Sequence, residues 1–335
     1  MKIAVLGAGF SGLAVAWTLL QHKLKTNSIE VTLFDSEGIA SGASGVAAGL
    51  FHPFAGIHAK LNRFGYEGYN ATLELLKAAE HTLGSRPFDT SGILRTAISP
   101  LQADEFKICS QNYPHDVQWL STDEVKTFIP GIAATPGILI KNGITVYSEN
   151  YLKGLFLNCV KSGLVFNQQK IDSLDSLKEF DQIIVAMGAD CTSLKELSHL
   201  KLSYTKGQIL ELLWPADLPP LPIALNSHIY CVMLPDKKRC LVGSTYEKQY
   251  ASREPDWEIA KQEILPKLGL LYPSLKDAEV LNCRTGIRVS GPQHLPLLQK
   301  ISERCYVLTG MGSKGLLYHG LYARKLCDLI LGLNL

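Results

Sequence analysis

The sequence predicts an α/β protein in two parts, one built on a parallel sheet and the other mainly on antiparallel strands. Three observations support this division. The chain opens with an apolar strand, a glycine-rich turn and a helix, and it closes with the same order of elements. Alternating strands fill residues 204–244, interrupted by a proline-rich stretch. With 335 residues, the chain is long enough for two lobes that each have a core.

The first elements carry a nucleotide-binding fingerprint. Residues 2–6 read as a buried strand, Gly7-Ala8-Gly9-Phe10-Ser11-Gly12 as the turn, and residues 11–25 as a helix. The first glycine permits the tight turn, the second lets the backbone approach a pyrophosphate, and the third packs helix on strand. A second strand, 30–34, ends at Asp35, where a carboxylate accepts hydrogen bonds from ribose hydroxyls. The unit therefore predicts a Rossmann-like dinucleotide site.

A loop of small residues follows this unit over residues 36–56, and small residues allow a ligand to approach the backbone closely. The pattern then predicts a long amphipathic helix over 60–83 and a hairpin over 137–147. Ser121 and Glu124 have the spacing of a capping box.

The chain then returns to the first part. A helix over 151–160 and a strand over 164–167 precede the buried strand 181–186, which ends at Met187-Gly188. A strand over 306–309, the turn Gly310–Gly315 and a last helix close the chain. We therefore expect a discontinuous first domain and an inserted second domain, with the boundaries 1–85, 148–203 and 286–335 for the first and 86–147 and 204–285 for the second.

Composition and charge narrow the class of protein. With 46% hydrophobic and 19% charged residues and a net charge of +2, the chain has the profile of a soluble enzyme. No apolar run is long enough for a membrane span. The eight cysteines form no C-x-x-C pair, which predicts no metal site and favours a cytoplasmic location. Two basic clusters are candidate nucleic-acid contacts, with a solvated surface as the alternative: Lys195, Lys201 and Lys206, and Lys237, Lys238 and Arg239.

Three features favour FAD over a nicotinamide cofactor as the dinucleotide. They are the loop of small residues just after Asp35, the strand end at Met187-Gly188, and the glycine turn before the last helix. Together they offer contacts to the pyrophosphate, the adenine side and the flavin ring. A dissociable nicotinamide cofactor needs less enclosure.

The sequence resembles the D-amino-acid oxidase superfamily of FAD-dependent oxidoreductases almost from end to end. The resemblance rests on six ordered segments: Gly7–Gly12, Gly42-Ala43-Ser44 with Ala48-Gly49-Leu50, Lys206-Gly207-Gln208, Leu241–Thr245, Gly286-Ile287-Arg288 with Leu295-Pro296, and Gly310–Leu316. The chain is most similar to the FAD-containing half of the bifunctional enzymes that modify the wobble uridine of tRNA, and it is also similar to glycine oxidases. The local matches to that half are Gly42–Gly45 with His52-Pro53, Leu61–Phe64, Gly286–Leu297 and Gly312–Leu316.

This resemblance implies a Rossmann-like FAD-binding domain with a second, mainly antiparallel-sheet substrate domain. The residues expected to contact FAD are Gly7, Ala8, Gly9, Phe10, Ser11, Gly12, Phe34, Asp35, Ser36, Ser41, Gly42, Ala43, Ser44, Ala48, Gly49, Leu50, Ile171, Met187, Gly188, Gly312, Ser313, Lys314, Gly315 and Leu316. Some relatives hold flavin through a cysteine at the place of Gly286, so noncovalent FAD is expected. The family commonly has an aspartate before the Leu-Pro stretch, where this chain reads Gly291-Pro292-Gln293.

Three residues are candidate catalytic residues. The resemblance places Arg288 where relatives bind the substrate carboxylate, a task that suits the guanidinium fork, and a structural ion pair is the alternative. Tyr230 falls near a family tyrosine that reaches the substrate, with a core tyrosine as the alternative. His52 is predicted to contact substrate or flavin, or else to be structural. Lys314 either places positive charge near the flavin or points to solvent.

The resemblance implies that the protein oxidises the carbon–nitrogen bond of an amine that bears a carboxylate. The first candidate substrate is the carboxymethylaminomethyl group of tRNA wobble uridine. Free glycine-like or D-amino acids form the alternative substrate class, and a non-catalytic FAD-binding protein is the third alternative. The sequence does not resemble the methyltransferase half of the fused enzymes. If tRNA is the substrate, a separate methyltransferase is therefore an expected partner of this protein.

Overall fold

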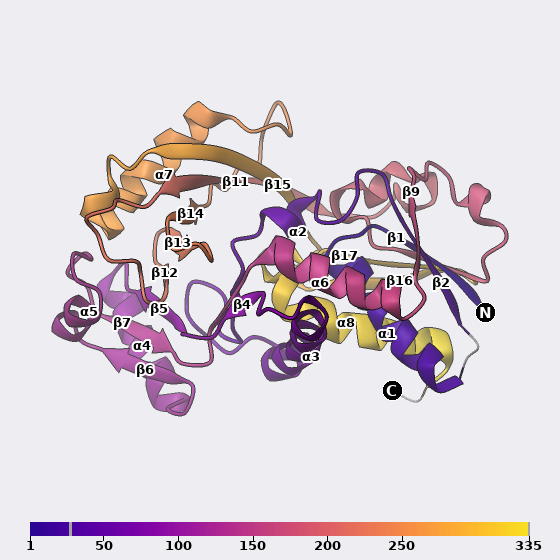
Figure 1. Cartoon of the computed structure of the whole chain (residues 1–335), viewed down its shortest axis with the longest axis horizontal. Coiled ribbons are helices and arrows are strands. Elements are labelled where there is room, and N and C mark those ends of the chain that lie inside the picture. The colour runs from indigo at the N-terminus through magenta and orange to yellow at the C-terminus, as the bar shows by residue number, and fades with distance from the viewer. Residues whose placement is uncertain (27–28, 334–335) are drawn as a thin grey trace.

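In the computed structural model, which describes residues 1–26 and 29–333, a six-stranded sheet and an eight-stranded sheet form opposite ends of the molecule (Figure 1). The six-stranded sheet has the order β16-β17-β10-β1-β2-β9. All its neighbouring pairs are parallel except β16 with β17. Its strands are β1 (Lys2–Leu6), β2 (Glu30–Asp35), β9 (Val165–Gln168), β10 (Gln182–Val185), β16 (Leu297–Ser302) and β17 (Cys305–Thr309).

Two separate cores cover the faces of this sheet because successive side chains of a strand point to opposite faces. Ile3 and Val5 pack with the helices of one face, whereas Ala4 and Leu6 pack with residues 171–202 on the other. The helices are α1 (Phe10–Thr26), α3 (Gly65–Leu83), α6 (Ser148–Lys161) and α8 (Gly315–Leu331). The opposite face carries the short turns η1 (Leu174–Leu177), η2 (Gly188–Ser193) and η3 (Lys195–Leu197).

The eight-stranded sheet has the order β15-β11-β14-β13-β12-β5-β7-β6 and is antiparallel except for the pair β12 and β5. Its strands are β5 (Ile93–Thr96), β6 (Val117–Leu120), β7 (Gly137–Ile140), β11 (Ser203–Leu213), β12 (Ala224–Asn226), β13 (Tyr230–Met233), β14 (Arg239–Gly243) and β15 (Val280–Ser290). One face packs against α5 (Thr122–Phe128), α7 (Trp257–Leu271) and η4 (Pro273–Leu275). The other face packs against α4 (Pro100–Asn112) and the loop after Ala48.

A small third sheet replaces the hairpin that was predicted over 137–147. It contains β3 (Leu50–Phe51), β8 (Ile144–Val146) and β4 (Phe88–Asp89), in the order β3-β8-β4. The hairpin prediction is wrong because β7 and β8 belong to different sheets. The Val146 amide donates to the Gly49 carbonyl at 2.8 Å, so β8 pairs with a distant segment rather than with β7.

The long helix predicted over 60–83 begins later, at Gly65. Phe64 adopts a left-handed conformation with φ 57°, and the Asn62 amide group donates to the carbonyls of Pro53 and Ala55. These bonds hold the preceding residues in a turn that a helix cannot include. The capping box is confirmed, since the Ser121 hydroxyl and the Glu124 carboxylate each accept from the other's amide.

The end of β15 brings the two large sheets together. Ser290 forms an isolated bridge with Met311, and the Gly291 amide donates to the Gly310 carbonyl at 3.1 Å. The expected domain boundary at residue 286 falls inside β15, which remains paired with β11 as far as Ser290. The last residues of β15 therefore lie against the turn that precedes α8.

Within the described ranges, no helix combines the length and the apolar character that a membrane crossing requires. All eight cysteines belong to this part of the chain, and each is buried with a free thiol. The same residues contain no cluster of histidine, cysteine and acidic side chains suited to a metal ion.

Candidate active site

The turn between β1 and α1 has the geometry of a phosphate-binding loop. Gly7 has φ 104°, a conformation that L side chains rarely adopt. A Cβ on Gly12 would lie 1.8 Å from the Gly7 carbonyl oxygen, so only glycine lets α1 approach β1 this closely. The amides of Gly9, Ser11 and Gly12 have no protein acceptor among the described residues. They stand at the positive end of a helix, where an anion is favoured.

The short helix α2 (Ala43–Val46), from the loop of small residues, packs beside this turn. The Ser44 hydroxyl accepts a hydrogen bond from the Phe10 amide at 3.1 Å. A Cβ on Gly9 would lie 2.8 Å from that hydroxyl, and a Cβ on Gly286 would lie 2.9 Å from the Ala43 Cα. The loop thus approaches the phosphate turn at Gly9 and β15 at Gly286, two positions that have no side chain.

Asp35 stands at the end of β2, next to the phosphate turn. One carboxylate oxygen accepts from the Ala8 amide at 2.7 Å, and the other accepts from the amides of Glu37 and Gly38 at 3.0 and 2.9 Å. These bonds fix the carboxylate while leaving lone pairs for a further donor. Beside Asp35, three predicted contact residues pack in one apolar cluster: Phe34, Ile171 and Met187.

The remaining predicted FAD contacts surround these elements. Gly42 and Gly188 border open space, since no heavy atom lies within 4 Å of a Cβ built on either. Ser41 is exposed and donates to the Gly38 carbonyl, and Ser36 is also exposed. Gly49 has φ 86° and approaches the Val146 carbonyl too closely for a Cβ. Leu50 starts β3, two residues after the buried Ala48.

The turn before α8 faces the end of β15. It contains η6 (Gly312–Lys314), which leads directly into Gly315 and Leu316 at the start of α8. Gly312 has φ 57°, and a Cβ there would lie 3.0 Å from the Ser290 hydroxyl oxygen. Partial burial lowers the pKa of Lys314. The positive end of a 17-residue helix therefore points toward the junction between the two large sheets.

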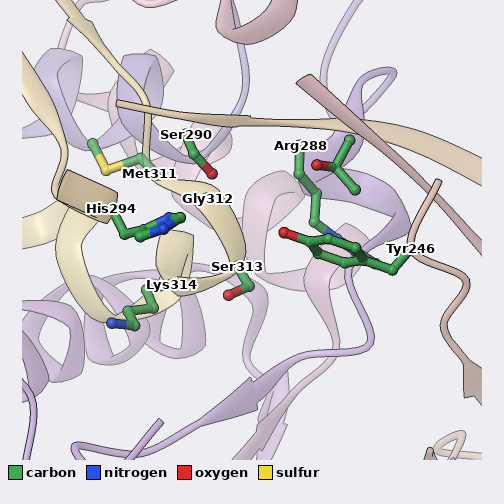
Figure 2. Close-up of a pocket in the computed structure, with 9 residues that line it drawn as sticks. Tyr246, Arg288, Ser290, His294, Met311, Gly312, Ser313 and Lys314 are labelled. Carbon is green, nitrogen blue, oxygen red and sulfur yellow. The ribbon is translucent and has the colours of Figure 1, made fainter. Parts of the chain in front are cut away.

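A pocket at this junction collects residues from the eight-stranded sheet and from the turn before α8, as Figure 2 shows. Arg288 on β15 and Thr205 on β11 are direct neighbours in the sheet. The lining residues are Thr205, Tyr246, Arg288, Ser290, His294, Met311, Gly312, Ser313 and Lys314. None of these nine side chains is acidic, whereas Arg288 and Lys314 are basic, so the pocket suits an anion.

The side chain of Arg288 is held by neutral groups. Its guanidinium donates to the Ser244 hydroxyl at 2.5 Å and to the Thr245 carbonyl at 3.5 Å, and it lies 6.0 Å from the centre of the Tyr246 ring. A Cβ on Gly207 would lie 2.2 Å from one guanidinium nitrogen. Within the described chain, no carboxylate pairs with Arg288, so the structural ion pair considered above is not found. Its charge remains available to a ligand.

Tyr230 is not among the residues that line the pocket. The Tyr230 hydroxyl shares a hydrogen bond with Ser244, the same residue that accepts from Arg288. Burial raises the pKa of Tyr230 to about 12, although the Arg288 charge and the Ser244 hydrogen bond act in the opposite direction. Tyr230 is therefore protonated at neutral pH and contributes a neutral hydroxyl to the support of Arg288.

His52 also lies outside the pocket lining. Its Nδ1 accepts from the Phe54 amide at 3.2 Å, which leaves Nε2 to carry the proton. Burial and the nearby Arg95 cation lower the pKa of His52 to about 3, so the ring is neutral. Arg95 is itself buried and donates to the carbonyls of Phe54 and Gly56. Through these bonds, His52 and Arg95 anchor the backbone at the end of the small-residue loop.

Of the first basic cluster predicted as a nucleic-acid contact, Lys195 and Lys201 are exposed, but Lys206 is buried. Lys206 is only 3% exposed, and its ammonium donates to the Glu254 carbonyl at 2.7 Å. In the second cluster, Arg239 pairs with Asp236 and Glu211. Lys206 therefore cannot contact RNA, because alternation along β11 turns it away from the pocket and into the layer below α7.

Five lining residues had no role predicted from the sequence: Thr205, Tyr246, Ser290, His294 and Met311. Four of them belong to or adjoin segments that the sequence had singled out. Ser290 and His294 lie within Gly286–Leu297, Met311 lies within Gly310–Leu316, and Tyr246 directly follows Leu241–Thr245. Their pocket position depends on contacts between distant segments, which local patterns do not show.

These features fit FAD. The unpartnered amides of the first turn suit a pyrophosphate, the open surfaces at Gly42 and Gly188 leave room beside it, and the start of α8 suits the electron-rich edge of a flavin. The basic pocket with Arg288 lies next to that helix start.

Comparison with known proteins agrees with this assignment. The family model described as FAD dependent oxidoreductase, DAO, matches residues 2–329. The tRNA 5-methylaminomethyl-2-thiouridine biosynthesis bifunctional protein MnmC of Maricaulis maris is 25% identical over 332 residues, covering 98% of this chain and 52% of that protein. MnmC of Burkholderia lata is 26% identical, covering 90% and 49%. The chain thus spans about half the length of these curated relatives.

Solved structures share the fold. Glycine oxidase from Geobacillus kaustophilus superimposes with a TM-score of 0.84 at 20% identity, covering 100% of this chain and 96% of that one. Iminodiacetate oxidase from Chelativorans sp. BNC1 gives a TM-score of 0.83 at 20% identity, covering 99% and 95%. The fold, the phosphate turn and the family match lead to one conclusion: the chain belongs to the DAO family of FAD-dependent oxidoreductases.

Proposed function

We propose that this protein oxidises the carbon–nitrogen bond of an amine that carries a carboxylate. The observation that carries the proposal is Arg288, which lines one pocket with the turn before α8, a pocket without acidic side chains, and whose guanidinium has no acidic partner in the described chain. A guanidinium binds a carboxylate through two parallel hydrogen bonds. Arg288 would therefore fix the orientation of the substrate.

The reaction places few demands on acid–base groups of the protein. When bound, FAD supplies the acceptor for the electron pair and hydrogen that leave the carbon next to the carboxylate. The substrate nitrogen loses its proton, an imine results, and water then adds to the imine carbon. Cleavage of the carbon–nitrogen bond releases an amine and an oxoacid. Arg288 holds the carboxylate in both steps, and Tyr230 and Ser244 hold Arg288.

Noncovalent FAD is part of the proposal. Position 286, where some relatives carry the cysteine that bonds to flavin, is glycine, and a Cβ there would come within 2.9 Å of the Ala43 Cα. Denaturation with acid is expected to release all of the yellow chromophore into the supernatant. Chromophore that stays with the precipitated protein would contradict noncovalent binding.

The favoured substrate is the carboxymethylaminomethyl group of a tRNA wobble uridine, because the curated relatives named above take part in 5-methylaminomethyl-2-thiouridine biosynthesis. Loss of the carboxymethyl group as an oxoacid would leave an aminomethyl group for a separate methyltransferase. Oxidation of free glycine-like amino acids is the second candidate, and its support is the fold shared with glycine oxidase.

The test measures reduction of the bound flavin in the absence of oxygen, monitored as the loss of its visible absorbance. The substrates are glycine, sarcosine, D-amino acids and tRNA with carboxymethylaminomethyl-uridine. We expect the tRNA to bleach the flavin and free amino acids to do so poorly. Bleaching by free amino acids alone would reverse the preference, and bleaching by none of them would contradict the proposed reaction.

Arg288→Gln tests whether the charge of Arg288 binds the substrate carboxylate. This substitution keeps hydrogen-bond donors but removes the charge, so we expect capture of carboxylate substrates to weaken roughly 10- to 100-fold, the loss typical of a charged hydrogen bond. Flavin content is expected to stay at the level of the parent protein. If the half-saturating concentration of a carboxylate substrate stayed unchanged, the proposed role of Arg288 in binding the carboxylate would be contradicted.

A further inference from the structure

Two exposed rings stand at the mouth of the pocket, and the reaction as proposed does not use them. Tyr246 is 60% exposed, although large aromatic side chains usually bury most of their surface. His294 is also exposed. Figure 2 shows the Tyr246 ring and the His294 imidazole on opposite sides of the pocket, with Arg288 beside Tyr246 and Ser313 between the two rings.

The backbone of Tyr246 is fixed even though its ring is exposed. On one side, the Thr245 amide donates to the Gln208 carbonyl at 3.1 Å. On the other side, Glu247 and Lys206 exchange two backbone hydrogen bonds of 2.9 Å. Both neighbours of Tyr246 are therefore tied to β11. The ring is presented by a rigid edge of the sheet, with one side toward the Arg288 guanidinium at 6.0 Å.

His294 is presented by an equally constrained turn. It lies in η5 (Pro292–His294) and has φ 57°, a left-handed conformation that is uncommon outside glycine. Its amide donates to the Gly291 carbonyl at 3.2 Å, and the Gly291 amide donates to Gly310 at 3.1 Å. The turn is thereby linked to the segment that leads into α8. The backbone that carries each ring is thus held by hydrogen bonds within the chain.

We propose that Tyr246 and His294 form a ring bracket that holds a planar ring attached to the substrate nitrogen, and that this ring is a pyrimidine nucleobase. The inference rests on the proposed function and specifies the substrate class of the same site. With the carboxylate held by Arg288, the other substituent of the nitrogen leaves the pocket through the mouth, where the two rings stand. Aromatic side chains stack on any base because every base has a π-face.

The charges around the pocket agree with a nucleotide. Arg288 and Lys314 line it without any acidic side chain, so a phosphate group near the mouth meets no carboxylate from the lining. Glycine and sarcosine carry no ring and would leave the bracket unused. The bracket therefore discriminates between a nucleotide-borne amine and a free amino acid, and not between amines with and without a carboxylate.

The experiment compares two substrates that share the carboxylate but differ in the ring: the nucleoside 5-carboxymethylaminomethyl-uridine and sarcosine. The substrate concentration that gives half of the maximal rate of anaerobic flavin reduction (the half-saturating concentration) is measured for the parent, Tyr246→Leu, His294→Asn and Tyr246→Phe. Asparagine tolerates the left-handed conformation at position 294 but has no ring. His199→Asn, at an exposed position outside the pocket lining, is the control for histidine replacement.

For each variant, the half-saturating concentration of the nucleoside is divided by that of sarcosine. We expect Tyr246→Leu and His294→Asn each to raise this ratio by roughly 5- to 100-fold, the range for loss of one base stack. Tyr246→Phe keeps the ring and is expected to keep the ratio of the parent, as is His199→Asn. An equal loss for both substrates would mean that Tyr246 acts only through Arg288, and it would overturn the bracket.

A binding measurement separates this inference from the proposed reaction. The nucleoside 5-aminomethyl-uridine lacks the carboxymethyl group, and its binding is followed as a change in the flavin absorbance spectrum without reduction. We expect weaker binding to Tyr246→Leu than to the parent. If no amine bleaches the flavin but this difference persists, the proposed reaction fails and the bracket stands. Equal binding to both proteins overturns the bracket whatever the result of the reduction assay.

Discussion

The guanidinium of Arg288 has room in the pocket because residue 207, on the neighbouring strand, has no side chain. A Cβ at this position would lie 2.2 Å from one guanidinium nitrogen and 2.5 Å from the guanidinium carbon. Gly207→Ala is therefore expected to displace Arg288 and to raise half-saturation for carboxylate substrates about 10-fold or more, since a charged hydrogen bond is lost or distorted.

Steady-state kinetics and flavin content check this prediction together. Gly269→Ala is the matched control, because a Cβ there meets nothing closer than 3.5 Å and alanine favours the helix that contains it. If Gly207→Ala captured substrate as well as the control, the close contact between these two residues would not limit the position of Arg288.

A second prediction at the residue scale concerns His319, which is fully buried in α8. Its Nδ1 donates to the Gly315 carbonyl at 3.0 Å and its Nε2 accepts from the Tyr151 hydroxyl at 2.7 Å. Burial lowers the pKa of His319 to about 4, below the ordinary 6.5. As pH falls from about 6.5 toward 4, the unfolded chain gains a proton that the folded protein does not, so stability decreases.

The expected loss from this histidine is about 1.4 kcal/mol per pH unit in that window, and His52, lowered in the same direction, adds to it. Urea unfolding of the flavin-loaded protein at several pH values measures the slope. His319→Gln is expected to reduce the slope of the free energy of unfolding against pH by the amount that corresponds to about one proton. A variant that kept the parent's full slope would place the titration on other groups.

At the scale of elements, the contact between α1 and β1 depends on Gly12. Because a Cβ there would lie 1.8 Å from the Gly7 carbonyl oxygen, Gly12→Ala is expected to push α1 away and disturb the amides that suit a pyrophosphate. We expect most of the bound FAD to be lost, as measured by the ratio of visible to ultraviolet absorbance after purification.

Gly269→Ala is the control for this prediction too, since a Cβ there meets nothing closer than 3.5 Å and α7 contributes none of the expected FAD contacts. Circular dichroism confirms that both variants are folded. Full FAD content in folded Gly12→Ala protein would contradict the argument from close packing.

Local patterns identified the elements with strong periodicity better than they identified partners. β1, α1 and β2 lie within a residue or two of their predicted bounds because an apolar strand, a glycine turn and a helix are each encoded by adjacent residues. The hairpin over 137–147 was wrong because strand pairing depends on a distant chain segment, here Gly49. The turn ahead of Gly65 depends likewise on bonds from Asn62 to carbonyls seven and nine residues away.

At the scale of the whole molecule, Arg284 on β15 links the eight-stranded sheet to α6, a helix that covers the six-stranded sheet. Its guanidinium donates to Glu149 at the start of α6 at 2.5 Å and to Glu211 on β11 at 3.2 Å. The Glu211 side chain is 6% exposed and also pairs with Arg239, whereas the Glu149 side chain is 61% exposed. The buried carboxylate of Glu211 thus depends on two cations.

Arg284→Met is expected to destabilise the protein by roughly 1–3 kcal/mol, because a buried carboxylate loses one hydrogen-bonded partner. Glu149→Ala is expected to cost less than about 1 kcal/mol, as is usual for an exposed ion pair. Urea midpoints of the two variants provide the comparison. Equal costs would mean that the exposed half of the link matters as much as the buried half.

The sequence by itself determined the phosphate turn, the acid that ends β2, the glycine turn before α8 and the membership of Arg288 in the family pattern, because each depends on residues that are neighbours along the chain. Only the tertiary structure decided that Tyr246 and His294 line the same pocket and that Lys206 is buried. It also set Tyr230 and His52 outside the pocket lining. The physical reason is that such positions follow from strand pairing and packing between segments that lie far apart in sequence.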